Sequence, residues 1–162
     1  MRKAIIFLLI LIFSSFGAVI AQNDSNNQKG WIPQYPSNID LPLSQDELLK
    51  LDKAYGDELK SQILNRPVRL KDIKDILRNR VFIYKENIKD ISKISLLSNV
   101  AIFDIYNSKL RRPIFRKNDF NPLLYNFNFF SKTKQIYRAD NTNYLIVIKP
   151  RELKWENLKQ NI

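Results

Sequence analysis

The 162-residue chain contains no histidine and no cysteine, and these two absences restrict the chemistry open to it. Histidine bases, cysteine nucleophiles and the usual ligand sets of zinc, copper and haem all need an imidazole or a thiolate. Hydrolysis would have to use carboxylates, as glycosidases do, or serine–lysine or tyrosine chemistry. We therefore expect no metal, no cofactor and no enzymatic activity.

One pair of carboxylates has a spacing that catalysis could use. Asp72 and Asp75 are three positions apart on a predicted helix and so share a face. However, Lys71, Lys74 and Arg78 surround them. This mixture of charges is typical of a solvated helix face, which is the interpretation that the sequence favours.

The chain is basic, and its charge is unevenly distributed. It carries 27 Lys and Arg against 16 Asp and Glu, a net charge of +11. Residues 22–60 contain 4 basic and 7 acidic residues, whereas residues 61–162 contain 21 and 9. The basic character therefore belongs to the C-terminal part.

The densest cationic stretch, residues 109–138, contains Asp119 as its only acid and is rich in aromatic residues. Cations interleaved with rings can bind phosphate-bearing polymers or rest on anionic lipid surfaces. Alternatively, the rings lie in the core and the cations face water, as in any basic β protein. The candidate partner-binding residues are Lys109, Arg111, Arg112, Arg116, Lys117, Lys132, Lys134 and Arg138, together with Trp31 and Tyr35.

The N-terminus has the layout of a signal peptide. Arg2 and Lys3 precede an apolar run from Ile5 to Phe13, and a cut after Ala21 would follow small residues. The run is too short to span a bilayer, and no later apolar stretch is long enough. We expect residues 1–21 to be removed and the protein to be periplasmic or extracellular, where we do not expect nucleic acid to be its partner.

Residues 22–43 read as an extended polar leader containing three prolines. Its apolar residues are few and spaced: Trp31, Ile32, Tyr35 and Ile39. They could dock as a strap along the domain or bind a partner, and the alternative is a mostly disordered leader.

The domain proper, residues 44–162, begins with helical patterns. Ser44 and Glu47 form a capping box, which predicts a helix from Gln45 to Leu64 with Gly56 as its weak point. After Pro67, the spacing of Leu70, Ile73 and Ile76 predicts a second, shorter helix.

From Val81 onward the patterns are those of strands. Segments rich in β-branched and aromatic residues predict strands at 81–84, 100–106, 124–130, 135–138 and 144–148, with a hairpin loop at 139–143. Residues 87–97 read as a short helix or a packed connection. Helices followed by strands predict an α+β fold, with the N-terminal helices on one face of an antiparallel sheet of about five strands.

Three functions are compatible with these patterns. The first is an exported, non-enzymatic subunit or adaptor of a bacterial cell-envelope assembly, which contacts a protein or an anionic membrane or glycan surface. The second is a small secreted hydrolase that works through two carboxylates facing one concave pocket. The third is a protein that binds polyanions, nucleic acid included.

Overall fold

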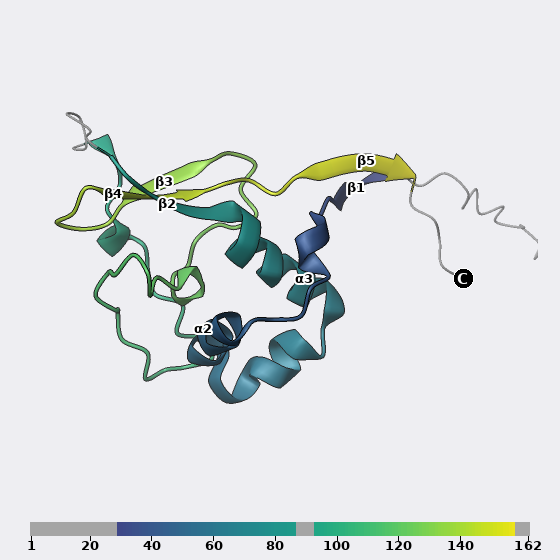
Figure 1. Ribbon diagram of the computed structural model, residues 1–162, viewed down its shortest axis with the longest axis horizontal. Helices are drawn as coiled ribbons and strands as arrows, with labels where there is room; N and C mark the ends of the chain where they lie inside the picture. Colours follow the sequence, from purple (N-terminus) through teal and green to yellow (C-terminus); the bar gives the residue numbers. More distant parts are fainter. Residues whose placement is uncertain (1–28, 87–92, 158–162) are drawn as a thin grey trace, which may run out of the picture. The chain divides into compact units, whose positions relative to one another are not determined.

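The computed structural model describes residues 29–86 and 93–157 (Figure 1). The chain divides into two units, one containing residues 29–31 and 155–157 among those described, the other residues 32–154. The predicted signal peptide, the first part of the predicted leader and most of the predicted 87–97 connection lie outside the described residues.

The described elements are short and mix α-, 3-10 and π-helical turns with five strands. In chain order they are β1 (Lys29–Pro33), η1 (Ser37–Ile39), α2 (Gln45–Tyr55), η2 (Gly56–Glu58), η3 (Lys60–Leu64), α3 (Pro67–Asp75), η4 (Ile76–Arg80), β2 (Val81–Lys85), η6 (Leu97–Asn99), η7 (Pro122–Leu124), β3 (Gln135–Arg138), β4 (Tyr144–Ile148) and β5 (Leu153–Asn157).

Helix α2 begins at the predicted capping box. The Ser44 hydroxyl accepts a hydrogen bond from the Glu47 amide, and the Glu47 carboxylate accepts one from the Ser44 amide. The helix ends earlier than predicted, because Gly56 adopts a φ of 50° that breaks the helical path. The predicted single helix to Leu64 is therefore wrong: the chain continues as the separate turns η2 and η3.

The second predicted helix is confirmed as α3, followed directly by η4. Pro67 occupies its first turn, where the missing amide hydrogen of proline costs nothing. Ile73 and Ile76 are buried, as their spacing predicted.

Three of the predicted strands form an antiparallel sheet in the order β2-β4-β3. Val81 pairs with Ile148, and Gln135 pairs with the same residue from the other side. The hairpin between β3 and β4 is also confirmed, and Asn141 takes a φ of 55° in its loop. Asparagine tolerates this left-handed conformation better than most residues.

The predicted strands at 100–106 and 124–130 are wrong. These segments are joined by one isolated bridge, Ile102 to Tyr125, and by hydrogen bonds such as Phe103 N–H to the Leu124 carbonyl, at 2.9 Å. Instead of alternating between two faces, consecutive side chains from Phe120 to Tyr125 are all buried. The segment fills the interior as an irregular chain around the short turn η7.

Two strands, β1 and β5, were not predicted and form a separate two-stranded sheet. The α+β class is confirmed, with five strands divided between two sheets. Figure 1 shows the three-stranded sheet above α2, with the short green turn η7 between them.

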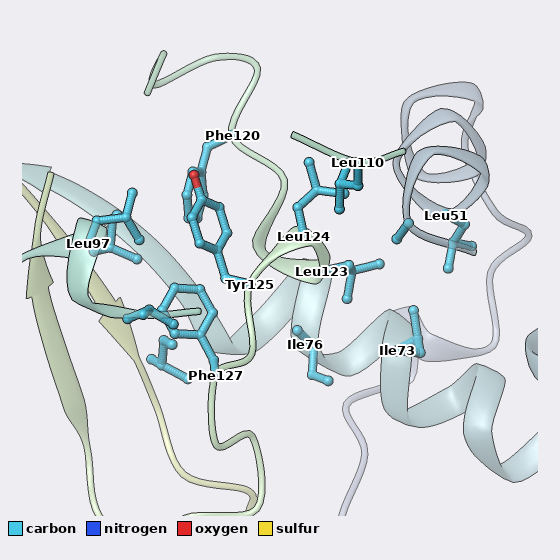
Figure 2. Packing of buried hydrophobic residues seen from close by; sticks show 14 of the residues in the cluster. Leu51, Ile73, Ile76, Leu97, Leu110, Phe120, Leu123, Leu124, Tyr125 and Phe127 are labelled. Atoms are coloured by element: carbon cyan, nitrogen blue, oxygen red, sulfur yellow. The ribbon is translucent and has the colours of Figure 1, made fainter. Parts of the chain in front are cut away.

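The core joins side chains from the helices, the irregular segment and the sheet (Figure 2). Leu51 of α2, Leu124 of η7 and Ile146 of β4 are almost inaccessible to solvent. Burial of one such side chain contributes roughly 1.5–3 kcal/mol. Without a disulfide, this packing carries the stability of the domain.

Candidate functional site

The predicted partner-binding cations are mostly in solvent. Seven are exposed, namely Lys109, Arg111, Arg112, Arg116, Lys117, Lys132 and Lys134, and Arg138 is half-buried. Within the described ranges 29–86 and 93–157, none of these eight has a carboxylate oxygen within 4.0 Å. Their positive charge is therefore not neutralised by ion pairs in the described part of the domain.

These cations do not form one continuous cluster. The Lys117 ammonium lies 5.9 Å from the centroid of the Tyr144 ring, where β4 begins. Lys132 and Lys134 instead precede Gln135, which pairs with Ile148 at the other end of β4. Four strand steps of about 3.3 Å separate the two ends by roughly 13 Å. Lys117 and the Lys132–Lys134 pair therefore lie at opposite ends of β4.

Arg112 has a structural role. Its guanidinium donates hydrogen bonds to the Leu97 carbonyl at 3.2 Å and the Val100 carbonyl at 2.6 Å. It also lies 5.7 Å from the centroid of the buried Tyr125 ring. The guanidinium of the neighbouring Arg111 donates a hydrogen bond to the Leu110 carbonyl at 3.3 Å.

Lys149 is a cation that the sequence interpretation did not select. It is exposed, follows β4 directly, and places its ammonium 4.5 Å from the centroid of the Phe82 ring. The position of Lys149 immediately after a strand that pairs with β3 was the signal that could have grouped it with Lys134.

The aromatic residues of the basic stretch lie mostly in the core. Phe120, Tyr125 and Phe127 are buried. The ring centroid of Tyr125 lies 5.6 Å from that of Phe120, in a stacked pair, and 5.4 Å from that of Phe127, in a tilted pair. Phe130 is the exception, since 74% of it is exposed. The surface at 109–138 is thus cationic rather than aromatic, in agreement with the alternative interpretation that the rings are core residues.

Trp31 and Tyr35, the other two candidate contacts, lie in different surroundings. Trp31 is exposed and packs edge-on against Trp155 of β5, with ring centroids 5.2 Å apart. Tyr35 is half-buried, and its hydroxyl donates a hydrogen bond to the Asp72 carboxylate. The Tyr35 hydroxyl is therefore occupied within the domain, whereas the Trp31 face is accessible.

The interpretation of Asp72 and Asp75 as a solvated face is wrong. Asp75 and Arg80 are each only 4% exposed, and Arg80 Nη1 lies 3.8 Å from Asp75 Oδ2. Burial raises the pKa of Asp75, although the Asn79 amide and the Arg80 charge act in the opposite direction. Asp72 forms an ion pair with Arg151 as well as the bond to Tyr35.

Burial also affects the cations and the phenol of this ionic cluster. It lowers the pKa of Arg80, whose guanidinium donates to the carbonyls of Lys149, at 3.1 Å, and Phe129. Burial, followed by the hydrogen bond to Asp72, raises the pKa of Tyr35 to about 12. Each carboxylate of the pair thus faces an arginine: Asp75 faces Arg80, and Asp72 faces Arg151.

Residues 32–43 dock on this part of the domain, and we call them the strap. Ile39 is 1% exposed. The Lys74 ammonium donates to the Ile39 carbonyl at 3.0 Å and the Leu41 carbonyl at 2.7 Å. Arg78 donates to the Pro42 carbonyl at 2.8 Å and also to that of Asn38. The sequence had raised docking as one of several possibilities for this segment.

Arg78 also binds the N-terminal turn of α2. Its Nε is 2.5 Å from Glu47 Oε1, and its Nη2 is 2.7 Å from Glu47 Oε2, a two-point contact. These hydrogen bonds are the main reason that the pKa of Glu47 is lowered to about 2. One guanidinium therefore links α2, the strap and η4.

Cavities of two different sizes border residues already described. The larger, about 530 Å³, is bordered by Asp72, Arg69 and a set of aromatic and aliphatic side chains. The smaller, about 280 Å³, is bordered by Arg116 and Asp119 together with Lys53, Pro113 and Ile114. Each of these two cavities has a single carboxylate on its wall, whereas a two-carboxylate hydrolase needs both facing one pocket.

Two further observations concern the described residues alone. Residues 29–86 and 93–157 contain no group of three or more acidic side chains placed to hold a metal ion. In the same ranges, no helix has the length and apolar character needed to cross a membrane.

The comparisons with known proteins give no relative from which a role could be transferred. No protein-family model, no curated protein and no solved structure matches the chain.

Proposed function

We propose that this protein is an exported, non-enzymatic subunit or adaptor of a bacterial cell-envelope assembly. Its exposed cations at 109–117 and 132–134 would contact an anionic partner, either a protein or the envelope surface. The observation that carries the proposal is that these side chains are exposed and lack carboxylate partners within the described ranges.

The distribution of ion pairs supports this proposal. Five acids between Asp40 and Asp75 form ion pairs, namely Asp40, Asp46, Glu47, Asp72 and Asp75. They pair with cations of the helices and with Arg151, and none of them reaches segment 109–138. Unpaired surface charge of one sign steers and orients an oppositely charged partner.

An exposed aliphatic side chain within the cationic segment also supports a contact surface. Ile114 is 85% exposed and lies between Arg111 and Arg116 in the sequence. Interfaces commonly combine an apolar contact with a surrounding polar and charged rim. The nearby 280 Å³ cavity, bordered by Ile114 and Arg116, adds a concave element to this surface.

The two alternative functions receive less support. Oδ1 of Asp72 is bound by both Arg151 and Tyr35, so a hydrolase would have to break an ion pair before using this carboxylate. Stacking on nucleic-acid bases requires accessible rings, and Tyr125 and Phe127 are buried.

The proposal is tested by capture from the protein's own envelope. The full chain, tagged at its C-terminus and expressed in its host, would be purified from gently solubilised envelopes at low salt. We expect envelope components to co-purify and to dissociate as the salt concentration rises towards about 0.5 M, where charges attract one another over only a few ångströms.

A matched pair of variants identifies the surface. Arg111→Glu, Arg116→Glu and Lys117→Glu together should abolish the co-purification. Lys60→Glu, Lys85→Glu and Lys93→Glu, which reverse the same number of exposed cations elsewhere, should preserve it. Equal retention by both triple variants, or a wild-type protein that purifies alone, would contradict the proposal.

A further inference from the structure

The larger cavity has the walls of a ligand site. Its lining comes from α2, α3, η4 and the irregular segment, and Figure 2 shows five of these residues, Ile73, Ile76, Leu123, Tyr125 and Phe127. The remaining apolar lining consists of Tyr55, Phe103, Phe129 and Phe130. The volume of about 530 Å³ lies within the range of pockets that enclose small organic ligands. A largely apolar wall of this size favours a ligand with an apolar body.

The polar part of the lining carries one cation without an acidic partner. The Arg69 guanidinium donates to the neutral Gln62 Oε1 at 3.1 Å and lies 5.8 Å from the centroid of the Tyr55 ring. Within residues 29–86 and 93–157, no carboxylate lies within ion-pair distance of it.

The acid in the same lining is already neutralised. Asp72 forms its ion pair with Arg151 and accepts the hydrogen bond of Tyr35. The charge that a ligand meets at the cavity is therefore the positive charge of Arg69. Because a guanidinium presents several N–H donors in a plane, it matches a carboxylate head group.

The solvent side of the cavity is also defined. Asn126 and Asn128 are exposed and belong to the lining, and Asn128 Oδ1 accepts a hydrogen bond from the Phe130 amide at 3.1 Å. The ring of Phe130 stays exposed, with the Arg151 guanidinium 5.2 Å from its centroid. A ligand can thus enter from solvent without unfolding of the core.

We propose that this cavity binds a monocarboxylate with an apolar body, the carboxylate held by Arg69 and the body packed against the rings and aliphatic side chains. This site is distinct from the proposed cationic contact surface, because none of the cations of segment 109–138 lines the cavity. The two proposals can therefore fail separately.

The test measures binding of decanoate and of decanol to the full chain by calorimetry, below the concentrations at which either aggregates. We expect decanoate to bind, and Arg69→Gln to weaken it at least about tenfold, since a charge-assisted contact is lost. Decanol, which has the chain but no charge, should bind Arg69→Gln and wild type equally. The control Lys60→Gln removes an exposed cation outside the cavity and should leave decanoate binding unchanged.

A second variant tests the apolar part. Asn126→Trp places a large ring at the exposed side of the cavity and should weaken both probes, whereas Asn118→Trp, at an exposed position outside the lining, should weaken neither. Repeating the titration with 2-naphthoate distinguishes a flat ring from a flexible chain as the better apolar body. The proposal is overturned if wild type binds neither carboxylate, if Arg69→Gln weakens decanoate and decanol alike, or if Asn126→Trp changes nothing.

Discussion

The hydroxyl of Tyr35 donates a hydrogen bond to Asp72, a residue 37 positions further along the chain. Asp72 also pairs with Arg151, so one carboxylate connects the strap, helix α3 and the segment before β5. Such a connection stabilises contacts between segments that have no local reason to meet.

Removal of the Tyr35 hydroxyl should therefore destabilise the domain. Tyr35→Phe keeps the ring but leaves Asp72 without one of its donors, at an expected cost of roughly 1–2 kcal/mol. Urea denaturation followed by circular dichroism measures this cost. Tyr84→Phe is the control, because Tyr84 is exposed and its hydroxyl has no hydrogen-bond partner within the described part of the chain. Equal midpoints for the two variants would show that the bond to Asp72 contributes nothing.

The ion pair between Glu47 and Arg78 should make stability depend on pH. The pKa of Glu47 is about 2 in the folded protein against an ordinary value of 4.5, so its contribution is present above pH 4.5 and lost as the pH falls towards 2. Glu47→Gln retains the side-chain shape and should cost about 2–3 kcal/mol at pH 7. At pH 2 the difference from wild type should nearly vanish.

Urea midpoints of wild type and Glu47→Gln at pH 7, 4 and 2 provide the measurement. Glu86→Gln, at an exposed position after β2, serves as the control, and its urea midpoint should differ little from that of wild type at any of the three pH values. A gap between Glu47→Gln and wild type that stays constant with pH would exclude the charge of Glu47 as its cause.

Gly56 should not tolerate a side chain. A Cβ at this position would have room, since its nearest neighbour, the Tyr106 carbonyl oxygen, is 4.0 Å away. The cost arises instead from the φ of 50° combined with a ψ of −131°, and amounts to about 1–3 kcal/mol. Thermal unfolding of Gly56→Ala should show this loss, whereas Gly30→Ala, in strand β1, should be close to wild type. A Gly56→Ala protein as stable as wild type would refute the strain argument.

Arg111 and Arg112 should differ in how much they contribute to the free energy of unfolding. Arg112→Gln removes hydrogen bonds to two carbonyls and the contact with the Tyr125 ring, so we expect a loss of roughly 1–2 kcal/mol in the free energy of unfolding. Arg111→Gln should leave stability within about 0.5 kcal/mol of wild type. The reverse order in a denaturation experiment would contradict the assignment of Arg112 to the structure of the domain.

The sequence predicted well where the signal is local. Ser44 and Glu47 are three residues apart, and their reciprocal hydrogen bonds start α2 without help from distant segments. Strands β3 and β4 were predicted with the observed bounds, because a loop of Asp and Asn between two β-rich runs specifies a hairpin.

The prediction failed where distant segments decide the structure. The alternation of rings and amides around Tyr125 and Phe127 fits a strand and also fits an irregular chain with buried rings. Only the packing of the surrounding core distinguishes the two structures. Pairing of β1 with β5 joins opposite ends of the described chain, and no short pattern encodes it.

The candidate sites show the same division. The exposure of Arg111 and Lys117 could be predicted, because they lie in a stretch dense in positive charge. The burial of Asp75 could not be predicted, because it depends on Arg80 and on segments that do not share the helix face of Asp75. The cavity with Arg69 is lined by residues between positions 55 and 130, so the spacing of neighbouring residues could not predict it.

The contacts that dock the strap determine which substitutions the strap tolerates. Lys74 and Arg78 hold it through the carbonyl oxygens of residues 38, 39, 41 and 42, groups that every amino acid supplies. Among the strap side chains, Asn38 exchanges hydrogen bonds with Asn79, and Asp40 pairs with Lys71. Tyr35 and Ile39 anchor the strap through the Asp72 carboxylate and the interior. The number of residues between Tyr35 and Ile39 therefore matters more than which residues they are. Substitutions at positions 36 or 37 leave both anchors in place on the domain, whereas deletion of one of these residues displaces one anchor.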